Sequence, residues 1–425
     1  REDHMKKLLF ILFFTISLFH TSLFGQWFKQ TIPVNKPISG IKFIDSLKGW
    51  ACTSISTLGD SSFIMHSTNG GVNWNIQLTV ANIALYAISI IDANTGYCGG
   101  SSGPGRLFKT TNGGINWNEI GTPTRVTDMF FVNKDSGWIC NETSTADVRT
   151  TTDGGTTWQL RNSGLSDNIN RLFFLNYSTG WCGSRYFKKT TNAGLNWVQI
   201  YDLQTSGIYS LFFLDEQTGW IGITNNRVRF TTNGGFNWVD QILPPNSGST
   251  VYDLYFHNNT LGWAGTGFDK IFKTYNSGLN WGYQIDSSGS YRMSFSDTLK
   301  GWSGQLGISK TTNGGNGIIY VGLININNNI PNIYKLYQNY PNPFNSQTNI
   351  KFSITKRSTV AIKIFDILGR EKTIWQSGKL LDAGTHELQF NAGDFASGVY
   401  FYSITVSDES GSTRFKETKK MVLLK

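Results

Sequence analysis

The stretch KTTNGGINW, Lys109 to Trp117, returns along the chain in closely related form. The copies read HSTNGGVNW (66–74), TTTDGGTTW (150–158), KTTNAGLNW (189–197), FTTNGGFNW (230–238) and KTYNSGLNW (273–281), and a further copy, KTTNGGNGI (310–318), lacks the tryptophan. An apolar segment and a Gly-Trp or Gly-Tyr pair precede each copy, as in GIKFID and Gly49–Trp50. Repeats of about 40 residues with glycine turns and no helical periodicity are typical of four-stranded propeller blades.

Each turn makes a definite conformational demand. Paired glycines supply the positive φ values of a tight hairpin, and a preceding Asn or Asp can hydrogen-bond backbone N–H groups across the turn. We therefore interpret these polar residues as structural. They are Asn69, Asn112, Asp153, Asn192, Asn233, Asn276 and Asn313.

The copy at 310–318 is explained by the start of the chain. Trp27 and Gln30 resemble the NWVQ sequence that follows another turn, so we expect the N-terminal segment to form the outer strand of the last blade. Such a closure removes free sheet edges. The prediction is an all-β, seven-bladed β-propeller over residues 26–318, with turn tryptophans packed between neighbouring sheets. These are Trp27, Trp74, Trp117, Trp158, Trp197, Trp238 and Trp281.

The turns fit the Asp-box (BNR) pattern Ser/Thr-x-Asp-x-Gly-x-Thr-Trp, which residues 151–158 match at every position. The array resembles the propeller family of the photosystem II assembly factor, whose repeats also combine a GW pair with TTDGGxxW. The resemblance implies the fold. Because the same repeat occurs in many secreted bacterial proteins, it does not imply a role in photosynthesis.

The chain changes character after the array. An Asn-rich segment, 319–334, is predicted to be a linker, and residues 335–425 contain alternating strands such as the one carrying Val360, Ile362 and Ile364. About 90 residues of such strands favour a small immunoglobulin-like β-sandwich.

This tail resembles the type A C-terminal sorting domain of the type IX secretion system. The matching residues are Tyr340, Pro341, Asn342, Pro343, Phe344 and Asn345, followed by FDILGR (365–370), SGVYFY (397–402) and the terminal KKMVLLK. The resemblance implies recognition by the type IX secretion machinery and passage from the periplasm across the outer membrane. It also implies removal of the tail, in some relatives with attachment to lipopolysaccharide of the outer membrane.

The N-terminal residues 1–25 are expected to be a Sec signal peptide. Lys6 and Lys7 precede the apolar run Leu8 to Phe19, which is too short to span a bilayer. Arg1 to His4 precede the first methionine and are interpreted as non-native or as an overextended reading frame. We therefore expect a secreted or cell-surface protein.

Composition narrows the chemistry. The net charge is +9, but the basic residues form no stripe, so no nucleic-acid partner is expected. The sparse histidines and the lack of paired CxxC motifs predict no metal, and no cofactor is expected. Two readings of the cysteines stay open: buried thiols, or disulfides linking adjacent blades. The residues concerned are Cys52, Cys98, Cys140 and Cys182.

Two columns at the start of the inner strands vary between repeats. We predict that they surround one mouth of the channel and bind a polar ligand. The alternative is that Arg and Asp there pair with each other and with loop carbonyls. The ring consists of Tyr86, Asp128, Asn170, Arg171, Tyr209, Tyr252, Asp253, Tyr291 and Arg292.

The predicted function is a non-catalytic binding or scaffold module for a glycan or a protein. The alternative is a sialidase-like or glucanase-like Asp-box glycoside hydrolase. Arg171, Arg292 and Tyr291 would then bind and attack the substrate, or Asp128 and Asp253 would be the carboxylate pair. No glutamate lies near these columns, and this favours the first function.

Overall fold

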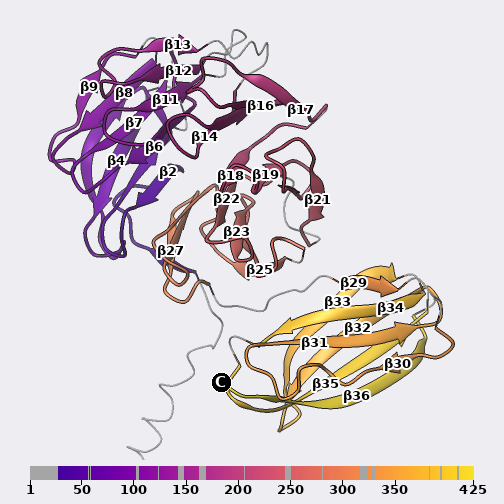
Figure 1. Ribbon diagram of the computed structural model, residues 1–425. Helices are drawn as coiled ribbons and strands as arrows, with labels where there is room; N and C mark the ends of the chain where they lie inside the picture. The colour runs from indigo at the N-terminus through magenta and orange to yellow at the C-terminus, as the bar shows by residue number, and fades with distance from the viewer. Residues whose placement is uncertain are drawn as a thin grey trace, which may run out of the picture.

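The computed structural model describes residues 27–425 apart from 56, 58, 102–104, 123, 142–147, 162–168, 205, 245–249, 280, 316–322, 328–330, 382, 393–394 and 409–410. The regular elements of the described residues are all β-strands (Figure 1). Among these residues, no helix has the length and apolar character that crossing a membrane requires. The expected signal peptide, 1–25, lies outside the described residues.

Seven four-stranded antiparallel sheets form the blades, and the inner strands contact one another in a closed ring (Figure 1). Blades 1 to 3 comprise β2 (Ile38–Phe43), β3 (Gly49–Thr53), β4 (Ser61–Ser67) and β5 (Asn75–Ala81); β6 (Ala84–Ile90), β7 (Gly96–Ser101), β8 (Gly105–Thr110) and β9 (Asn118–Ile120); and β10 (Asp128–Phe131), β11 (Gly137–Cys140), β12 (Val148–Thr151) and β13 (Gln159–Arg161).

Blades 4 to 7 repeat this arrangement from inner to outer strand. They comprise β14 (Arg171–Phe174), β15 (Gly180–Gly183), β16 (Tyr186–Thr190) and β17 (Val198–Asp202); β18 (Ser210–Phe213), β19 (Gly219–Ile223), β20 (Arg227–Thr231) and β21 (Val239–Ile242); β22 (Asp253–Phe256), β23 (Gly262–Gly265), β24 (Lys270–Thr274) and β25 (Gly282–Ile285); and β26 (Arg292–Phe295), β27 (Gly301–Gly304), β28 (Ile308–Thr311) and β1 (Phe28–Gln30).

The ring is closed by the start of the chain, and this confirms the predicted N-terminal closure. Strand β1 pairs antiparallel with β28, with Phe28 opposite Lys310 and Gln30 opposite Ile308. The adjacent Trp27 is buried, and its Nε1 donates to Oε1 of Gln284 at 3.0 Å. The last blade therefore takes its outer strand from the first described strand of the chain. Loss of this pairing would leave β28 as an unpaired sheet edge.

The GW tryptophans fill the space between blades. Trp138 of blade 3 is fully buried and stacks on Phe174 of blade 4, with ring centroids 3.6 Å apart. A Cβ on Gly137 would overlap the ring of Phe131, which explains why glycine precedes the tryptophan. Equivalent stacks join Tyr97 to Phe131, Trp181 to Phe213, Trp220 to Phe256, Trp263 to Phe295 and Trp302 to Phe43.

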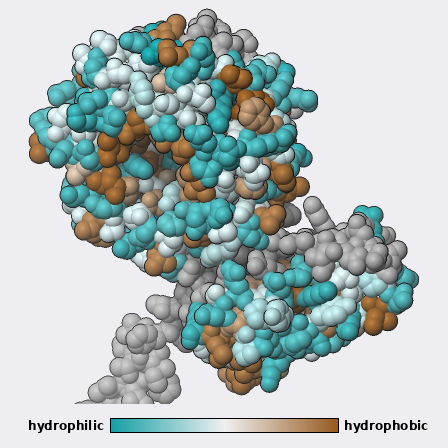
Figure 2. All heavy atoms as spheres, viewed as in Figure 1, coloured by the Kyte–Doolittle hydropathy of each residue, from teal (hydrophilic) through white to brown (hydrophobic). Residues whose placement is uncertain are grey.

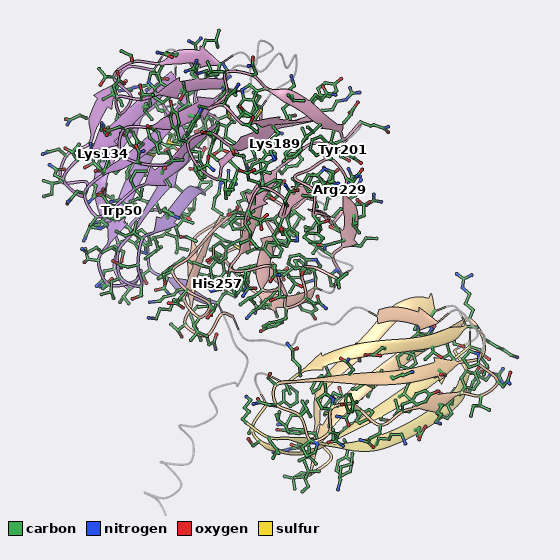
Figure 3. The ribbon with its side chains drawn as sticks, viewed as in Figure 1. Trp50, Lys134, Lys189, Tyr201, Arg229 and His257 are labelled. Carbon is green, nitrogen blue, oxygen red and sulfur yellow. The ribbon has the colours of Figure 1, made fainter. Side chains whose placement is uncertain are left out.

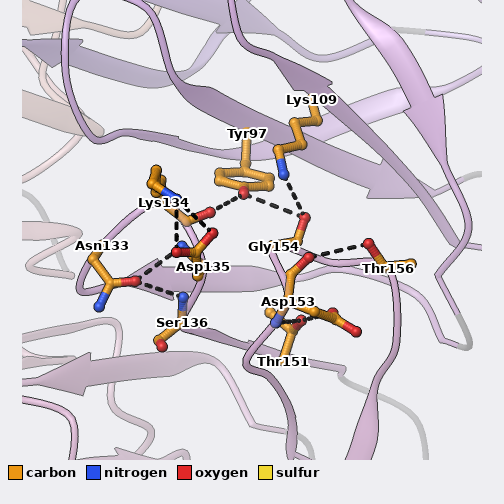
Figure 4. Close-up of polar contacts among 10 residues, drawn as sticks. All are labelled: Tyr97, Lys109, Asn133, Lys134, Asp135, Ser136, Thr151, Asp153, Gly154 and Thr156. Carbon is orange, nitrogen blue, oxygen red and sulfur yellow. Dashed lines mark hydrogen bonds and ion pairs between the residues drawn. The ribbon is translucent and has the colours of Figure 1, made fainter.

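The box turns connect each blade to the one before it. In blade 3, Thr157 N donates to Oδ1 of Asp153 at 2.9 Å, and this confirms that the polar turn residue accepts backbone N–H groups. The carbonyl oxygen of Gly154 then accepts from Lys109 Nζ (2.9 Å) and Tyr97 Oη (3.3 Å) of blade 2 (Figure 4). A backbone carbonyl of the box turn therefore accepts hydrogen bonds from side chains of the preceding blade.

The box tryptophans differ from their predicted position in one respect. They lie mainly against the inner-strand phenylalanine of their own blade, as Trp158 does on Phe131 with centroids 6.3 Å apart. The tryptophan of the GW pair forms the flat stack between blades. Less space therefore remains between the blades for the box tryptophan. Trp158, Trp197 and Trp238 stay partly exposed, whereas the other four box tryptophans are buried. Among these four, Trp74, Trp117 and Trp281 lie in clusters that include residues of the neighbouring blade, as predicted.

The outer surface carries paired charges. Arg229 of blade 5 lies beside Tyr201 of blade 4, with its Cζ 5.8 Å from the ring centroid (Figure 3). Arg229 and Arg227 both pair with Asp240, at 2.6 and 3.0 Å. Such exposed pairs contribute about 0–1 kcal/mol each, so the packed aromatic residues dominate the stability of the ring.

The C-terminal region is a sandwich of two four-stranded sheets, as predicted. One sheet contains β29 (Leu323–Asn327), β34 (Gly384–Asn391), β31 (Gln347–Ile354) and β30 (Lys335–Leu336); the other contains β33 (Glu371–Leu381), β32 (Ser358–Asp366), β35 (Gly398–Ser407) and β36 (Thr413–Leu423). Phe352 and Ile362 from opposite sheets belong to one buried core. The predicted linker 319–334 is wrong in part, because β29 lies within it and pairs with β34.

Candidate functional site

The variable ring lies where the inner strands begin. Asp128, Arg171, Asp253 and Arg292 are the first residues of β10, β14, β22 and β26. Because these strands surround one axis, their first residues converge, and Figure 2 shows a hollow at the centre of the propeller. A cavity of about 410 Å³ occupies this mouth. Its lining includes Tyr86, Arg171, Tyr252, Tyr291 and Arg292.

The two aspartates connect neighbouring inner strands. Asp128 accepts from Met129 N of its own strand and from Leu172 N of the next blade, each at 3.0 Å. Asp253 does the same with Leu254 N (3.0 Å) and Met293 N (2.6 Å). Burial raises the pKa of Asp253, while the nearby Arg292 opposes that rise. Both carboxylates are therefore used in holding blades together.

The two arginines do not pair with these aspartates. Within the described residues, no ion pair joins Arg171 or Arg292 to Asp128 or Asp253. Arg292 instead donates Nε to Ser39 O at 3.0 Å and Nη1 to Tyr291 O at 2.9 Å. The predicted alternative therefore holds in part: the charges of the arginines oppose the rise in the pKa of Asp253 that burial causes, without a direct ion pair, and both Arg171 and Arg292 donate to backbone carbonyls.

Arg171 has the freer guanidinium. Its Nη1 donates to Asn170 O at 2.6 Å, and the side chain lines both the mouth cavity and a deeper one of about 230 Å³. Burial and the charge of Arg292 lower the pKa of Arg171 to about 10. The group is still a cation at neutral pH, and a guanidinium carries five N–H donors.

Tyrosines form an arc over consecutive blades. The rings of Tyr252 and Tyr291 lie 4.4 Å apart, and Tyr209 meets Tyr252 edge to face at 5.8 Å. Burial raises the pKa of Tyr291. Gly267, with φ of 77°, passes so close to the Tyr291 ring that a Cβ would overlap it. The arc is held by packing and presents aromatic surface at the mouth.

The predicted ring is divided by the structure. The mouth cavity is lined by Tyr86, Arg171, Tyr252, Tyr291 and Arg292. The deeper cavity is lined by Asp128 and Asp253 together with Tyr86, Arg171 and Arg292. Asn170 and Tyr209 line neither, since the Asn170 amide donates to Ile208 O at 3.1 Å and Tyr209 packs on Tyr252.

An aromatic wall inside the channel was not predicted. Phe130, Phe173 and Phe212 line the deeper cavity, with successive ring centroids 5.3 and 5.7 Å apart. Tyr255 continues the row at 5.8 Å. Each lies two residues after a column position, for example Phe130 after Asp128. The period-2 alternation of strands carries this signal in the sequence.

All four cysteines are buried free thiols in this structure, and disulfides between adjacent blades stay a prediction for the exported protein. All four have no exposed surface. Burial raises the pKa of Cys98, Cys140 and Cys182.

The sorting motif is tied to the C-terminal strand. Asn342 Oδ1 accepts from Val422 N at 2.9 Å, and Phe344 N donates to Val422 O at 2.9 Å. Phe344 is buried in the sandwich core, whereas Tyr340 is 80% exposed. The motif and the terminal KKMVLLK are therefore parts of one structure.

This closed ring of box-bearing blades defines an Asp-box β-propeller joined to a secretion domain. Residues 20–308 match the model of the photosynthesis system II assembly factor YCF48 family, and the chain belongs to that family. Residues 338–422 match the secretion system C-terminal sorting domain. This domain indicates export by type IX secretion to the cell surface or the extracellular space.

Solved structures share the fold at low identity. The chain is similar to "YCF48 bound to D1 peptide" (19% identity, TM-score 0.56, covering 67% of this chain and 96% of that one) and to YCF48 from Cyanidioschyzon merolae (15%, 0.54, 68% and 98%). A GH74 xyloglucanase from Xanthomonas campestris is also similar (10%, 0.53, 91% and 68%). No curated protein matches the chain. At these identities the likeness establishes the fold alone.

Proposed function

We propose that the chain is an exported, non-catalytic binding or scaffold module. Its ligand, a glycan or a segment of another protein, enters the mouth of the propeller channel. The observation that supports this most strongly is Arg171, a cation that lines a cavity of about 410 Å³ and whose guanidinium, among the described residues, hydrogen-bonds through Nη1 to Asn170 O.

The chemistry of the mouth defines the ligand further. A guanidinium with free N–H groups favours a carboxylate, because paired N–H donors match its two oxygens. The rings of Tyr252 and Tyr291 offer a surface for stacking a sugar or a planar peptide group. One solved relative is described as bound to a D1 peptide, so a protein segment is a reasonable ligand for this propeller as well.

The use of the aspartates supports a non-catalytic role. A glycoside hydrolase of the usual kind needs one carboxyl group to donate a proton and a second to attack or activate water. Asp128 and Asp253 instead accept backbone N–H groups from two strands each. We expect no release of fluorophore from aryl glycosides. Turnover that Asp128→Asn abolishes in a folded protein would establish the hydrolase.

The sorting domain suggests where binding takes place. We propose that the tail is removed during type IX export and that the propeller remains at the outer surface, attached to lipopolysaccharide. The exposed Tyr340 and the motif loop that is hydrogen-bonded to β36 would form the part that the secretion machinery recognises.

The direct experiment compares binding by wild type and an Arg171→Ala variant of the full chain. The probes are oligosaccharides with and without uronic acids, and peptides with a free or amidated C-terminal carboxylate. We expect a carboxylate-bearing probe to bind the wild type and to lose at least tenfold in affinity with the variant, since a charge-assisted hydrogen bond contributes about 1.5–3 kcal/mol.

The control is Arg227→Ala, which removes an exposed arginine of the outer surface. It should bind like the wild type. Equal affinity for all three proteins would show that the mouth is architectural and would contradict the proposal.

A further inference from the structure

Two buried cysteines meet across the interface of blades 1 and 2. Cys52 lies on β3 and Cys98 on β7, both with no exposed surface and within one apolar cluster. The interaction of the two thiols lowers the pKa of Cys52, and burial together with that interaction raises the pKa of Cys98. Ser39 Oγ lies 3.5 Å from Cys52 Sγ. The two sulfur atoms are thus neighbours on different blades.

A glycine brings these blades close together. Cys52 pairs opposite Gly40 on β2, and Cys98 pairs opposite Ile88 on β6. A Cβ at Gly40 would lie 2.9 Å from Cys52 Sγ and 2.8 Å from Ile88 Cγ2, so any side chain there would separate the blades. Stacked sheets commonly lie about 10 Å apart, and a disulfide needs Cα atoms within about 7 Å. Gly40 allows the closer approach.

The second cysteine pair has the same register but different contacts. Cys140 lies opposite Asp128 and Cys182 opposite Leu172, so Asp128 takes the place of Gly40. Cys140 Sγ lies 3.5 Å from Ile169 O. Burial and the charge of Asp128, ahead of Cys182, raise the pKa of Cys140, and burial raises that of Cys182.

We propose that the exported protein contains one disulfide, Cys52–Cys98, and that Cys140 and Cys182 remain thiols. The sorting domain sends the chain through the periplasm, where disulfides form and persist. This inference is independent of the ligand at the channel mouth.

The oxidant is the disulfide of a periplasmic thiol–disulfide oxidoreductase. The thiolate of one cysteine attacks that disulfide and forms a mixed disulfide, releasing one thiol of the oxidant. The thiolate of the other cysteine then displaces the second thiol and forms the Cys52–Cys98 bond. Two electrons pass to the oxidant and two protons leave the cysteines. Since both sulfurs are buried in the folded ring, the exchange precedes the closure of blade 2 onto blade 1.

The test is the thiol content of the full chain after export to the periplasm. The protein is unfolded without reductant, alkylated with iodoacetamide and mapped by mass spectrometry. We expect two alkylated cysteines, Cys140 and Cys182, and one cross-linked peptide that contains Cys52 and Cys98. Four alkylated cysteines, a Cys140–Cys182 bridge or bridges in both pairs would each overturn the inference.

Thermal unfolding gives a second readout. A bond that closes the loop from 52 to 98 should raise Tm by about 5 °C. Reductant should remove this gain from the wild type and from Cys140→Ser/Cys182→Ser, but should leave Cys52→Ser/Cys98→Ser unchanged. If the last variant does not fold, the mass measurement on the wild type still decides. A reductant-insensitive Tm in the wild type would contradict the bond.

Discussion

The box turns and the channel mouth occupy equivalent places in every blade, but they differ in how uniform they are. At the turns, the same side-chain oxygen accepts the same N–H: Asn116 N to Asn112, Thr157 N to Asp153 and Asn237 N to Asn233, at 2.9–3.0 Å. At the mouth, one backbone column carries residues of quite different chemistry. These are Gly40, Ala87, Asp128, Arg171, Ser210, Asp253 and Arg292.

The difference separates architecture from recognition. A residue that returns in each blade meets the same neighbours each time, and so its role is set by the repeat. A residue that differs between blades at an equivalent backbone position is not required by the blade structure. Asp128 and Asp253 qualify this lesson, because they are unrepeated residues that nevertheless hold strands together. Arg171 is then the clearest candidate for a functional role.

The largest effect should come from a GW tryptophan. Trp181 is fully buried, stacks on Phe213 at 3.8 Å and donates Nε1 to Gly234 O at 3.0 Å. We expect Trp181→Ala to lower the free energy of unfolding by about 3–5 kcal/mol, measured by urea denaturation. The matched change Trp197→Ala, at a partly exposed box tryptophan, should cost less. An equal or larger loss of unfolding free energy in Trp197→Ala would contradict the claim that the GW tryptophans stabilise the ring more than the box tryptophans do.

A smaller effect is expected at the inter-strand aspartates. Asp128→Ala removes the acceptor of Leu172 N in the next blade and should cost about 1–3 kcal/mol of unfolding free energy. Asp128→Asn keeps one carbonyl oxygen and should cost less. If Asp128→Ala left the denaturation midpoint unchanged, the bridging role would be wrong and the carboxylate would again be a catalytic candidate.

The smallest effect concerns Asp153, the acidic member of an otherwise Asn-based set of turn residues. Hydrogen bonds from Thr157 and Thr151 lower its pKa from 3.8 to about 2. Because the folded pKa lies below the unfolded one, the stabilisation is present above pH 4 and is lost as the pH falls towards 2. Tm measured between pH 5 and 2 should therefore decline less in Asp153→Asn than in the wild type. Parallel curves would show that Asp153 does not contribute.

The repeated parts of the molecule could be predicted from the sequence. Seven turn motifs and a lone N-terminal tryptophan were enough to place Trp27 and the closing strand, because a repeat transfers one blade's geometry to all of them. The packing partner of each tryptophan was harder to predict from the sequence. Sequence spacing does not distinguish the inter-blade stack of Trp138 from the edge contact of Trp158.

The unrepeated contacts could not be predicted for a physical reason. The role of Asp128 depends on Leu172 N, which lies in another blade and becomes its partner only when the ring closes. The inclusion of β29 in the sandwich likewise depends on pairing with β34, and no turn motif in the sequence predicts that pairing. The sequence indicated that the mouth residues converge, but it did not reveal which side chains keep free donors.

The most direct test of the central claim measures stability and binding on the same proteins. Arg171→Ala should keep the unfolding free energy within about 1 kcal/mol of the wild type, since its guanidinium makes few contacts within the described residues. The same variant should lose the carboxylate-bearing probe that the wild type binds. An Arg171→Ala protein that remains folded and retains that probe with unchanged affinity would contradict the assignment of the channel mouth as the binding site.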